Sequence, residues 1–217
     1  VSFEGCSNLT SVTILGSSLS SIYSGTFYGC SSIDSVAITD IAAWCKINFG
    51  DEYANPLRTN PLLSARAKFF LNGEMITDLV IPNSVTSISK YAFYGYKRIT
   101  SVDIPSSVTS IGASAFSGCS GLTGITTIPN SVTTIGNDAF GECPGLITFE
   151  SETPIAYNSY SGSAVYVVPD NAVESYQTAW ADVAYRIIGK SALGWKEVTC
   201  EAQPTTSHLA ELIGVGN

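Results

Sequence analysis

The sequence predicts an elongated repeat solenoid, made mainly of short β-strands joined by turns and short helices. Three copies of one phrase follow each other between residues 81 and 143, and each contains Ala-Phe-x-Gly followed by Cys or Tyr, or Ala-Phe-Gly-Glu-Cys in the last copy. The phenylalanines of these copies, Phe93, Phe116 and Phe140, are 23 and 24 residues apart. A fixed period in this range is typical of solenoids, because one such unit cannot bury its apolar side without neighbours. We expect the coil to be right-handed.

The complete coils, at 82–104, 105–128 and 129–149, share one order of elements. Each opens with Pro-x-Ser-Val-x-x-Ile and closes with a piece such as 99–104, in which apolar and polar residues alternate. That alternation predicts a strand of a parallel sheet. The segment at 108–111 and its equivalents predict a shorter strand or turn on the opposite side. Ala115-Phe116 is expected to fill the core between the two.

Residues 1–38 predict further coils, and the repeat is then interrupted over residues 39–81. A short helix is expected at 42–47. Asn72-Gly73 stands between apolar stretches and predicts a β-hairpin with arms at 69–71 and 75–80, since Asn-Gly suits a type I′ turn. We expect this insertion to break the coil without ending the solenoid.

The pattern changes again after Glu150, and 151–190 is expected to form an α/β cap over the end of the apolar core. It contains a predicted strand at 164–168 and then a helix, for which Asn171 and Glu174 are spaced as a capping box. One face of that helix is expected to carry Val173, Tyr176, Trp180 and Ala184. Residues 191–217 are expected to be a tail or the start of a further domain.

Composition excludes some classes of partner. The chain is 45% hydrophobic and 13% charged, and its net charge is −8. An acidic chain lacks the basic stripe of a nucleic-acid-binding protein and is not drawn to anionic membranes. No apolar run reaches the roughly 18 residues of a membrane span. The chain begins inside a repeat with no visible signal peptide, so we interpret it as a mature or a trimmed fragment from which a signal peptide could have been removed.

Four of the six cysteines occupy one repeat position, namely Cys6, Cys30, Cys119 and Cys143. A zinc site would need cysteines paired as Cys-x-x-Cys, and the sequence contains no such pair. Residues stacked in parallel lie about 4.8 Å apart, whereas a disulfide needs Cβ atoms near about 3.8 Å. Buried thiols that act as small hydrophobic groups are therefore favoured, and Tyr96 in the same position supports packing. Disulfides between coils are the alternative.

The usual catalytic patterns are missing, so we predict neither an enzyme nor a cofactor. The single histidine, His208, lies in the tail and no nucleophile is placed for it. The acid pairs Asp51-Glu52 and Glu150-Glu152 are interpreted as solvated loop residues rather than as a glycosidase pair.

The outward positions of the long strands are the candidate binding site. Together with Ala37 they would form a ladder of small polar side chains, for which the ligand-binding candidates are Ser11, Thr13, Ser35, Ser101, Asp103 and Thr148. The simpler interpretation is a solvated sheet surface of good β propensity. The functional one is a shallow groove for a polypeptide or a glycan. The ladder contains no aromatic side chain, and the tyrosines are placed in turns, at Tyr23, Tyr28, Tyr91 and Tyr94.

The phrases Ile-Pro-x-Ser-Val-Thr-x-Ile-Gly, Ala-Phe-x-Gly-Cys and Leu-Thr-x-Val resemble BspA-type leucine-rich repeats of bacterial surface proteins, over residues 1–38 and 82–150. Segments at 44–47, 70–73 and 166–180 are also similar to stretches that recur in that family. The resemblance implies an exported or cell-surface protein that works in adhesion or protein binding. A glycan-binding module and a structural stalk that presents another domain are the alternatives.

Overall fold

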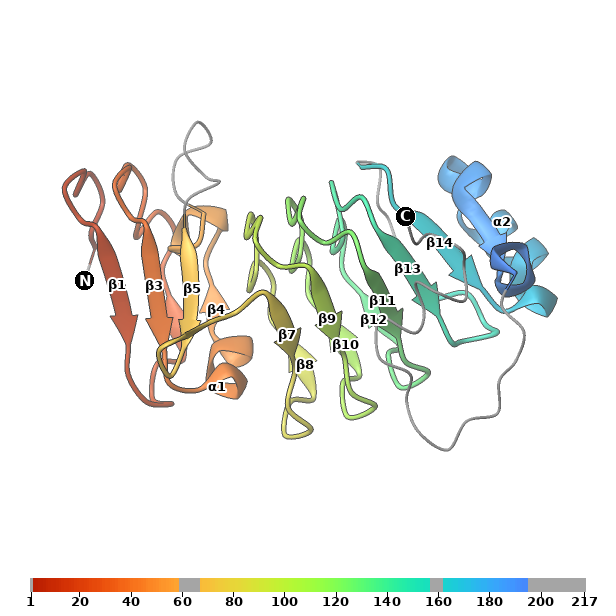
Figure 1. The fold of residues 1–217 in the computed structure, drawn as a ribbon, viewed down its shortest axis with the longest axis horizontal. Helices are drawn as coiled ribbons and strands as arrows, with labels where there is room; N and C mark the ends of the chain where they lie inside the picture. The colour runs from red at the N-terminus through yellow and green to blue at the C-terminus, as the bar shows by residue number, and fades with distance from the viewer. Residues whose placement is uncertain (1, 59–66, 157–161, 195–217) are drawn as a thin grey trace.

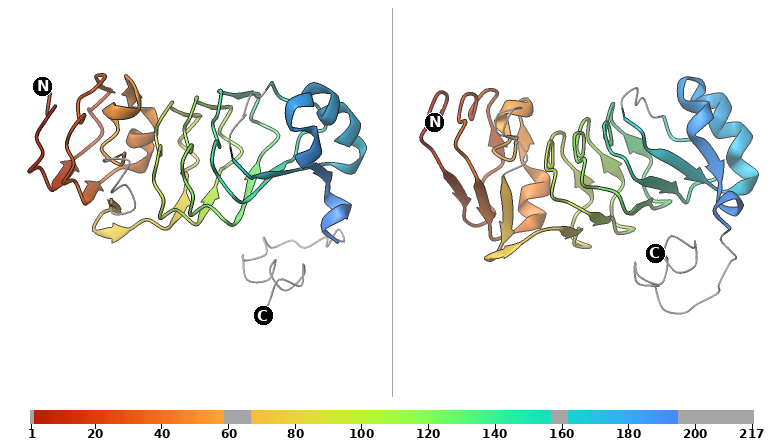
Figure 2. Two further views of the ribbon diagram at one scale, coloured as in Figure 1. Left: turned by 90° about the horizontal axis from the view of Figure 1, so that it is seen from above. Right: turned by 45° about the horizontal axis from the view of Figure 1, so that its top comes forward.

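The computed structural model describes residues 2–58, 67–156 and 162–194. The chain forms an elongated stack of coils whose long strands lie side by side along one face, with helix α2 (Val173–Ala179) at the C-terminal end of the stack (Figures 1 and 2). This arrangement confirms the predicted solenoid.

The long strands of the coils form the face that is turned to the viewer in Figure 1. All of them pair in parallel except β5 with β6, which pair antiparallel. The first sheet has the order β1 (Ser11–Ile14), β3 (Ser35–Ile38), β5 (Lys68–Leu71) and β6 (Glu74–Met75). A central pair follows, with β7 (Asp78–Val80) and β9 (Ser101–Asp103). The last sheet has the order β11 (Ile125–Ile128), β13 (Leu146–Phe149), β14 (Val165–Val168) and β15 (Ile187–Gly189).

Shorter strands form a second row on the opposite side of each coil, as predicted. They are β2 (Ser21–Ile22) with β4 (Asn48–Phe49), and β8 (Ser87–Ile88), β10 (Ser110–Ile111) and β12 (Thr134–Ile135). Ile88, Ile111 and Ile135 are aligned and buried, so this row also closes the core.

The core between the rows is built around a column of aromatic rings. Phe93 stacks on Phe116 with ring centroids 5.1 Å apart, and Phe116 stacks on Phe140 at 5.2 Å. All three side chains are buried, which confirms that the Ala-Phe pair fills the core. Aromatic contacts of this kind add stability beyond the burial of their area.

The interrupted region contributes strands to both rows. Helix α1 (Ile41–Lys46) is present as predicted, and the carboxylate of Asp40 caps its first turn by accepting from the N–H groups of Ala42 and Ala43. After it, β4 and β5 continue the short and the long row. The N–H of Phe27 donates to the carbonyl of Tyr53 at 3.0 Å. The short helix η1 (Glu52–Ala54) therefore takes the place of the Ala-Phe turn of the other coils.

The predicted hairpin is shorter than expected. Asn72 and Gly73 both have positive φ, 52° and 89°, and they join β5 to β6. The prediction that 75–80 is one arm is wrong, because β6 ends at Met75 and β7 pairs in parallel with β9 instead. The solenoid resumes at β7. Residues 78–80 pair with the strand of the next coil and are therefore not available to extend the hairpin.

The end of the stack is covered by α2 and three short 3₁₀ helices, η2 (Asp170–Ala172), η3 (Ala181–Arg186) and η4 (Lys190–Leu193). Tyr176 and Trp180 are buried against Phe149, with ring centroids 5.9 and 5.1 Å from its ring. Within the described ranges, every helix is too short or too polar to cross a bilayer.

Two details of the predicted helix are wrong. Its N-cap is Ala172 and no side chain caps it, because Asn171, the proposed N-cap, lies inside η2. The helix also ends at Ala179 with Trp180 as its C-cap, so Val183 is buried where Ala184 was expected. His208 and residues 195–217 lie outside the described residues.

Candidate binding surfaces

The solvent-facing side of β1, β3, β5 and β6, which we call the strand face, carries two aligned rows of side chains. Strand pairing aligns Ser11 with Ser35 and Lys68, and Thr13 with Ala37, Phe70 and Met75. The inward residues Val36 and Phe69 are buried, whereas Ser11, Thr13 and Lys68 are exposed. The structure thus brings three of the predicted residues, Ser11, Thr13 and Ser35, onto one surface.

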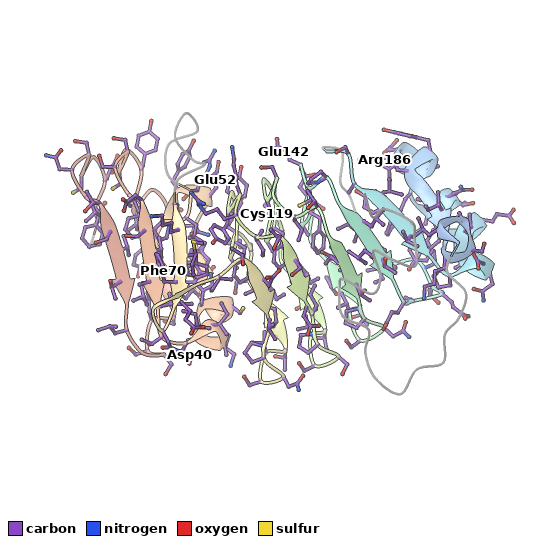
Figure 3. The ribbon with its side chains drawn as sticks, viewed as in Figure 1. Asp40, Glu52, Phe70, Cys119, Glu142 and Arg186 are labelled. Atoms are coloured by element: carbon purple, nitrogen blue, oxygen red, sulfur yellow. The ribbon has the colours of Figure 1, made fainter. Side chains whose placement is uncertain are left out.

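Phe70 is the member of the strand face that the sequence analysis missed. It lies beside Ala37 on β5, and Figure 3 shows it on the face turned to the viewer. Its neighbour Met75 is 43% exposed. The expectation that the ladder has no aromatic side chain is therefore wrong. Neighbouring residues of a strand point to opposite faces, so burial of Phe69 implies that Phe70 faces outward. The sequence did not show which residues of β3 these positions pair with, because the spacing between β3 and β5 departs from the repeat.

Ser101 and Asp103 lie on β9, where β7 brings Asp78 beside them. The hydroxyl groups of Ser101 and Thr100 donate to Oδ1 of Asp78, at 2.5 and 2.8 Å. These bonds, the one from Ser101 first, lower the pKa of Asp78. The Ser101 hydroxyl is thus engaged in a hydrogen bond to Asp78. Asp103 is exposed and pairs with Val80, which is 63% exposed.

Thr148 was expected to be exposed to solvent, and this is wrong. It is only 3% exposed, and the adjacent Ile147 and Phe149 are buried as well. Successive side chains of a strand point to opposite faces, so both faces of β13 are covered. The Thr148 hydroxyl has no hydrogen-bond partner among the described residues.

A second surface follows the turns at one edge of the solenoid, where Glu52 and Glu142 lie in Figure 3. The guanidinium carbon of Arg58 lies 4.3 Å from the ring centroid of Tyr53 and 5.0 Å from that of Tyr94. Tyr28 meets Tyr53 edge to face, with centroids 5.1 Å apart. Side chains from separate coils thus form one aromatic and cationic cluster, the turn-edge cluster, made of Tyr28, Tyr53, Arg58, Tyr91 and Tyr94.

Two hollows accompany these surfaces. One of about 240 Å³ lies in the turn-edge cluster and is lined by Tyr28, Ser31, Tyr53 and Arg58 among others. A larger one, about 480 Å³, lies at the open side of the first coil. Most of its lining residues are apolar, and their equivalents in other coils are buried in the core. Among them, Phe3 and Leu19 are 39% and 37% exposed.

The cysteines of the described ranges form no metal-binding cluster. Cys30, Cys119 and Cys143 are buried free thiols, which confirms the predicted packing role, while Cys6 is exposed and does not share it. Burial raises the pKa of Cys143 to about 12. In the described part of the chain, no three His, Cys, Asp or Glu residues gather as a metal site would require.

Comparison with known proteins agrees with this architecture. A family model described as BspA type leucine rich repeat region matches six copies, over residues 1–48 and 64–165. No curated protein matches the chain significantly.

Three similar solved structures are those of leucine-rich repeat proteins. That of T. pallidum is 17% identical, covering 78% of this chain and 83% of its own, with a TM-score of 0.42. That of Eubacterium ventriosum is 18% identical, covering 82% of this chain and 54% of its own, with a TM-score of 0.46. That of Bacteroides ovatus is 17% identical, covering 88% of this chain and 59% of its own, with a TM-score of 0.42.

Leucine-rich repeats of this type generally serve as protein-interaction or structural scaffolds and are generally not enzymes. The six matched copies, and the stacked coils in which they are found, place this chain in the family of BspA-type leucine-rich repeat proteins.

Proposed function

We propose that this chain is a non-enzymatic module at a bacterial cell surface or outside the cell, and that it binds a protein partner through the strand face. The observation that carries the proposal is the pair Phe70 and Met75, aligned across β5 and β6 and set among small polar side chains. Proteins of this family are generally surface or secreted proteins, which supports the location.

The composition of the strand face suits a protein interface. Aromatic residues and methionine are enriched at the centres of such interfaces, and a polar rim surrounds them. Here Phe70 is the aromatic anchor, Met75 is an adaptable neighbour, and Ser11, Thr13 and Ser35 form the polar surroundings. Lys68 adds a positive charge to a chain that is otherwise acidic.

The test is an array of purified extracellular-matrix and mucosal proteins, probed with the wild type and a Phe70→Ser, Met75→Ser double variant. Loss of an interface anchor weakens binding by about tenfold or more. The matched control is Tyr185→Ser, which removes a cap side chain that is 82% exposed and distant along the chain from the strand face. Thermal unfolding of each variant checks that the fold persists.

Binding that the double variant loses and the control keeps would support the proposal. Binding that both variants keep would move the interface elsewhere and overturn it. A wild type that binds no protein on the array would also overturn it, in favour of a stalk that presents another domain.

A further inference from the structure

The hollow in the turn-edge cluster differs from the strand face in shape and in chemistry. Its walls include the ring of Tyr28, which is 54% exposed, and the ring of Tyr53, which meets it at 82°. Two rings at this angle form a corner that offers both an aromatic face and an aromatic edge. Such a corner accepts a small ring whose own faces are apolar.

The third wall is Arg58, and contacts on several sides hold its guanidinium in place. It lies over the ring of Tyr53 and near that of Tyr94, and its Nη1 lies 3.2 Å from Oε1 of Glu52. Nη1 itself is buried and has no hydrogen-bond partner among the described residues, so it is not the atom that a ligand would reach. The guanidinium is a planar group with five N–H donors, and Arg58 lines the pocket.

The charge around the pocket argues against an anionic ligand. Glu52 balances Arg58 at short range. Asp51, the N-cap residue of η1, places a second carboxylate on the helix that carries Tyr53. A carboxylate or phosphate that approached Arg58 would meet these negative charges as well, whereas an uncharged ligand would not.

The size of the pocket limits the ligand further. Pockets for drug-sized molecules are about 300 to 1,000 Å³, and this one is about 240 Å³. One six-membered ring with hydroxyl groups fits such a space. Its C–H face can pack on Tyr28, and its hydroxyl groups can accept from Arg58 and exchange hydrogen bonds with the hydroxyl of Ser31, another lining residue.

We propose that this pocket is a carbohydrate subsite that holds one neutral pyranose ring of a glycan, stacked on Tyr28 and hydrogen-bonded by Arg58. The site is independent of the proposed protein interface. Glu52, the partner of Arg58, lies at the edge of the solenoid in Figure 3, whereas Phe70 lies on the broad face of the strands.

The experiment is saturation-transfer difference NMR on the full chain with four separate probes. Three are neutral, namely methyl α-mannoside, methyl β-galactoside and N-acetylglucosamine, and one is acidic, N-acetylneuraminic acid. Tyr28→Ala removes the stacking ring and is expected to weaken binding of the preferred neutral sugar by about tenfold. Tyr28→Phe keeps the ring and is expected to bind as the wild type does. Arg58→Lys keeps the charge but loses the planar fork of donors, so it is expected to bind more weakly.

Tyr185→Ala is the control, because it removes another highly exposed tyrosine from a different end of the chain. A preferred neutral sugar, lost with Tyr28→Ala and kept with Tyr28→Phe and Tyr185→Ala, is the expected result. Preference for N-acetylneuraminic acid, equal binding by Tyr28→Ala, or no binding of any probe would overturn the subsite. The Phe70→Ser, Met75→Ser variant should still bind the sugar, so the two proposals can fail separately.

Discussion

The thiol of Cys119 donates a hydrogen bond to the carbonyl oxygen of Phe93, 3.2 Å away in the preceding coil. The same bond joins Cys143 to Phe116 at 3.2 Å and Cys30 to Phe3 at 3.0 Å. In the coil with Tyr96, the phenol donates to the carbonyl of Ile76 instead. The repeated cysteine therefore fills a small buried space and also supplies a donor to the neighbouring backbone.

This arrangement predicts thiols of very different reactivity. With a pKa of about 12, Cys143 holds only about one thiolate in ten thousand molecules at pH 8, and the thiolate is the reactive form. Burial raises the pKa of Cys119 as well, while Cys6 is exposed. Iodoacetamide at pH 8 should therefore modify Cys6 rapidly and spare Cys119 and Cys143, as read by peptide mass spectrometry. Equal labelling of all three in the folded protein would contradict the burial.

The glycine of the Ile-Gly phrase is predicted to be required by close contact between coils. A Cβ on Gly112 would lie 2.3 Å from the backbone nitrogen of Lys90, so Gly112→Ala must displace backbone rather than a side chain. We expect a loss of about 1–3 kcal/mol in the free energy of unfolding, measured by denaturant titration. Ser89 holds the equivalent place one coil earlier and already carries a Cβ. Ser89→Ala is therefore the control, and a loss as large as that of Gly112→Ala would point to another cause.

The backbone conformation of Glu142 predicts that its replacement by glycine stabilises the fold. Its φ is 60°, and the equivalent residue one coil earlier, Gly118, has φ 76°. A left-handed conformation costs a residue with a side chain about 1–2 kcal/mol, part of which the greater freedom of unfolded glycine offsets. Glu142→Gly should thus raise the thermal midpoint. Glu142→Ala removes the carboxylate and keeps the strain, so the same rise in that variant would show that charge, not backbone conformation, is the cause.

The sequence was sufficient for the repeated elements and insufficient where the period is lost. Phe93, Phe116 and Phe140 recur at nearly constant spacing, so their shared place in the core follows from counting. Phe70 lies in register with Ala37 only because residues 39–67 together span one coil, and no local pattern in the sequence gives that length. The central residue of the proposed protein interface was therefore missed.

The turn-edge cluster was missed for a related reason. The sequence placed Tyr28 and Tyr94 in turns, but the contacts of Tyr28 with Tyr53 and of Tyr94 with Arg58 depend on how η1 replaces a turn of the solenoid. Thr148 shows the opposite limit. Alternation along β13 predicts correctly which way its side chain points, but says nothing about whether that side is covered.

Asn55 joins the coil that contains η1 to the following coil, and its hydrogen bonds predict the effect of two substitutions. Its side chain is fully buried, and its amide nitrogen donates to the carbonyls of Tyr91 at 2.6 Å and Ala92 at 3.0 Å. Asn55→Ala removes both bonds, and it also leaves the buried N–H of Leu57, which donates to Oδ1 of Asn55 at 2.9 Å, without an acceptor. This loss should cost about 2–3 kcal/mol of stability. Asn55→Asp should cost more at pH 7, because it turns a carboxylate toward two carbonyl oxygens. Denaturant unfolding of both checks the order, with the exposed Asn83→Ala as control; an aspartate variant as stable as the alanine variant would contradict it.

The hydrogen bonds of Asp78 on β7 predict a small acid-dependent contribution to stability. Hydrogen bonds from Ser101 and Thr100 lower its pKa in the folded protein, so they stabilise the ionised form. The unfolded pKa of aspartate is about 3.9. The contribution is therefore fully present above that value and is lost as the pH falls through the lower folded pKa. The stability difference between the wild type and Asp78→Asn should shrink between about pH 5 and pH 2, as measured by thermal unfolding across that range. Asp103→Asn, on the paired strand, removes a carboxylate that accepts no side-chain hydrogen bond among the described residues. If both variants followed the same pH dependence, the hydroxyl groups of Ser101 and Thr100 would not be its source.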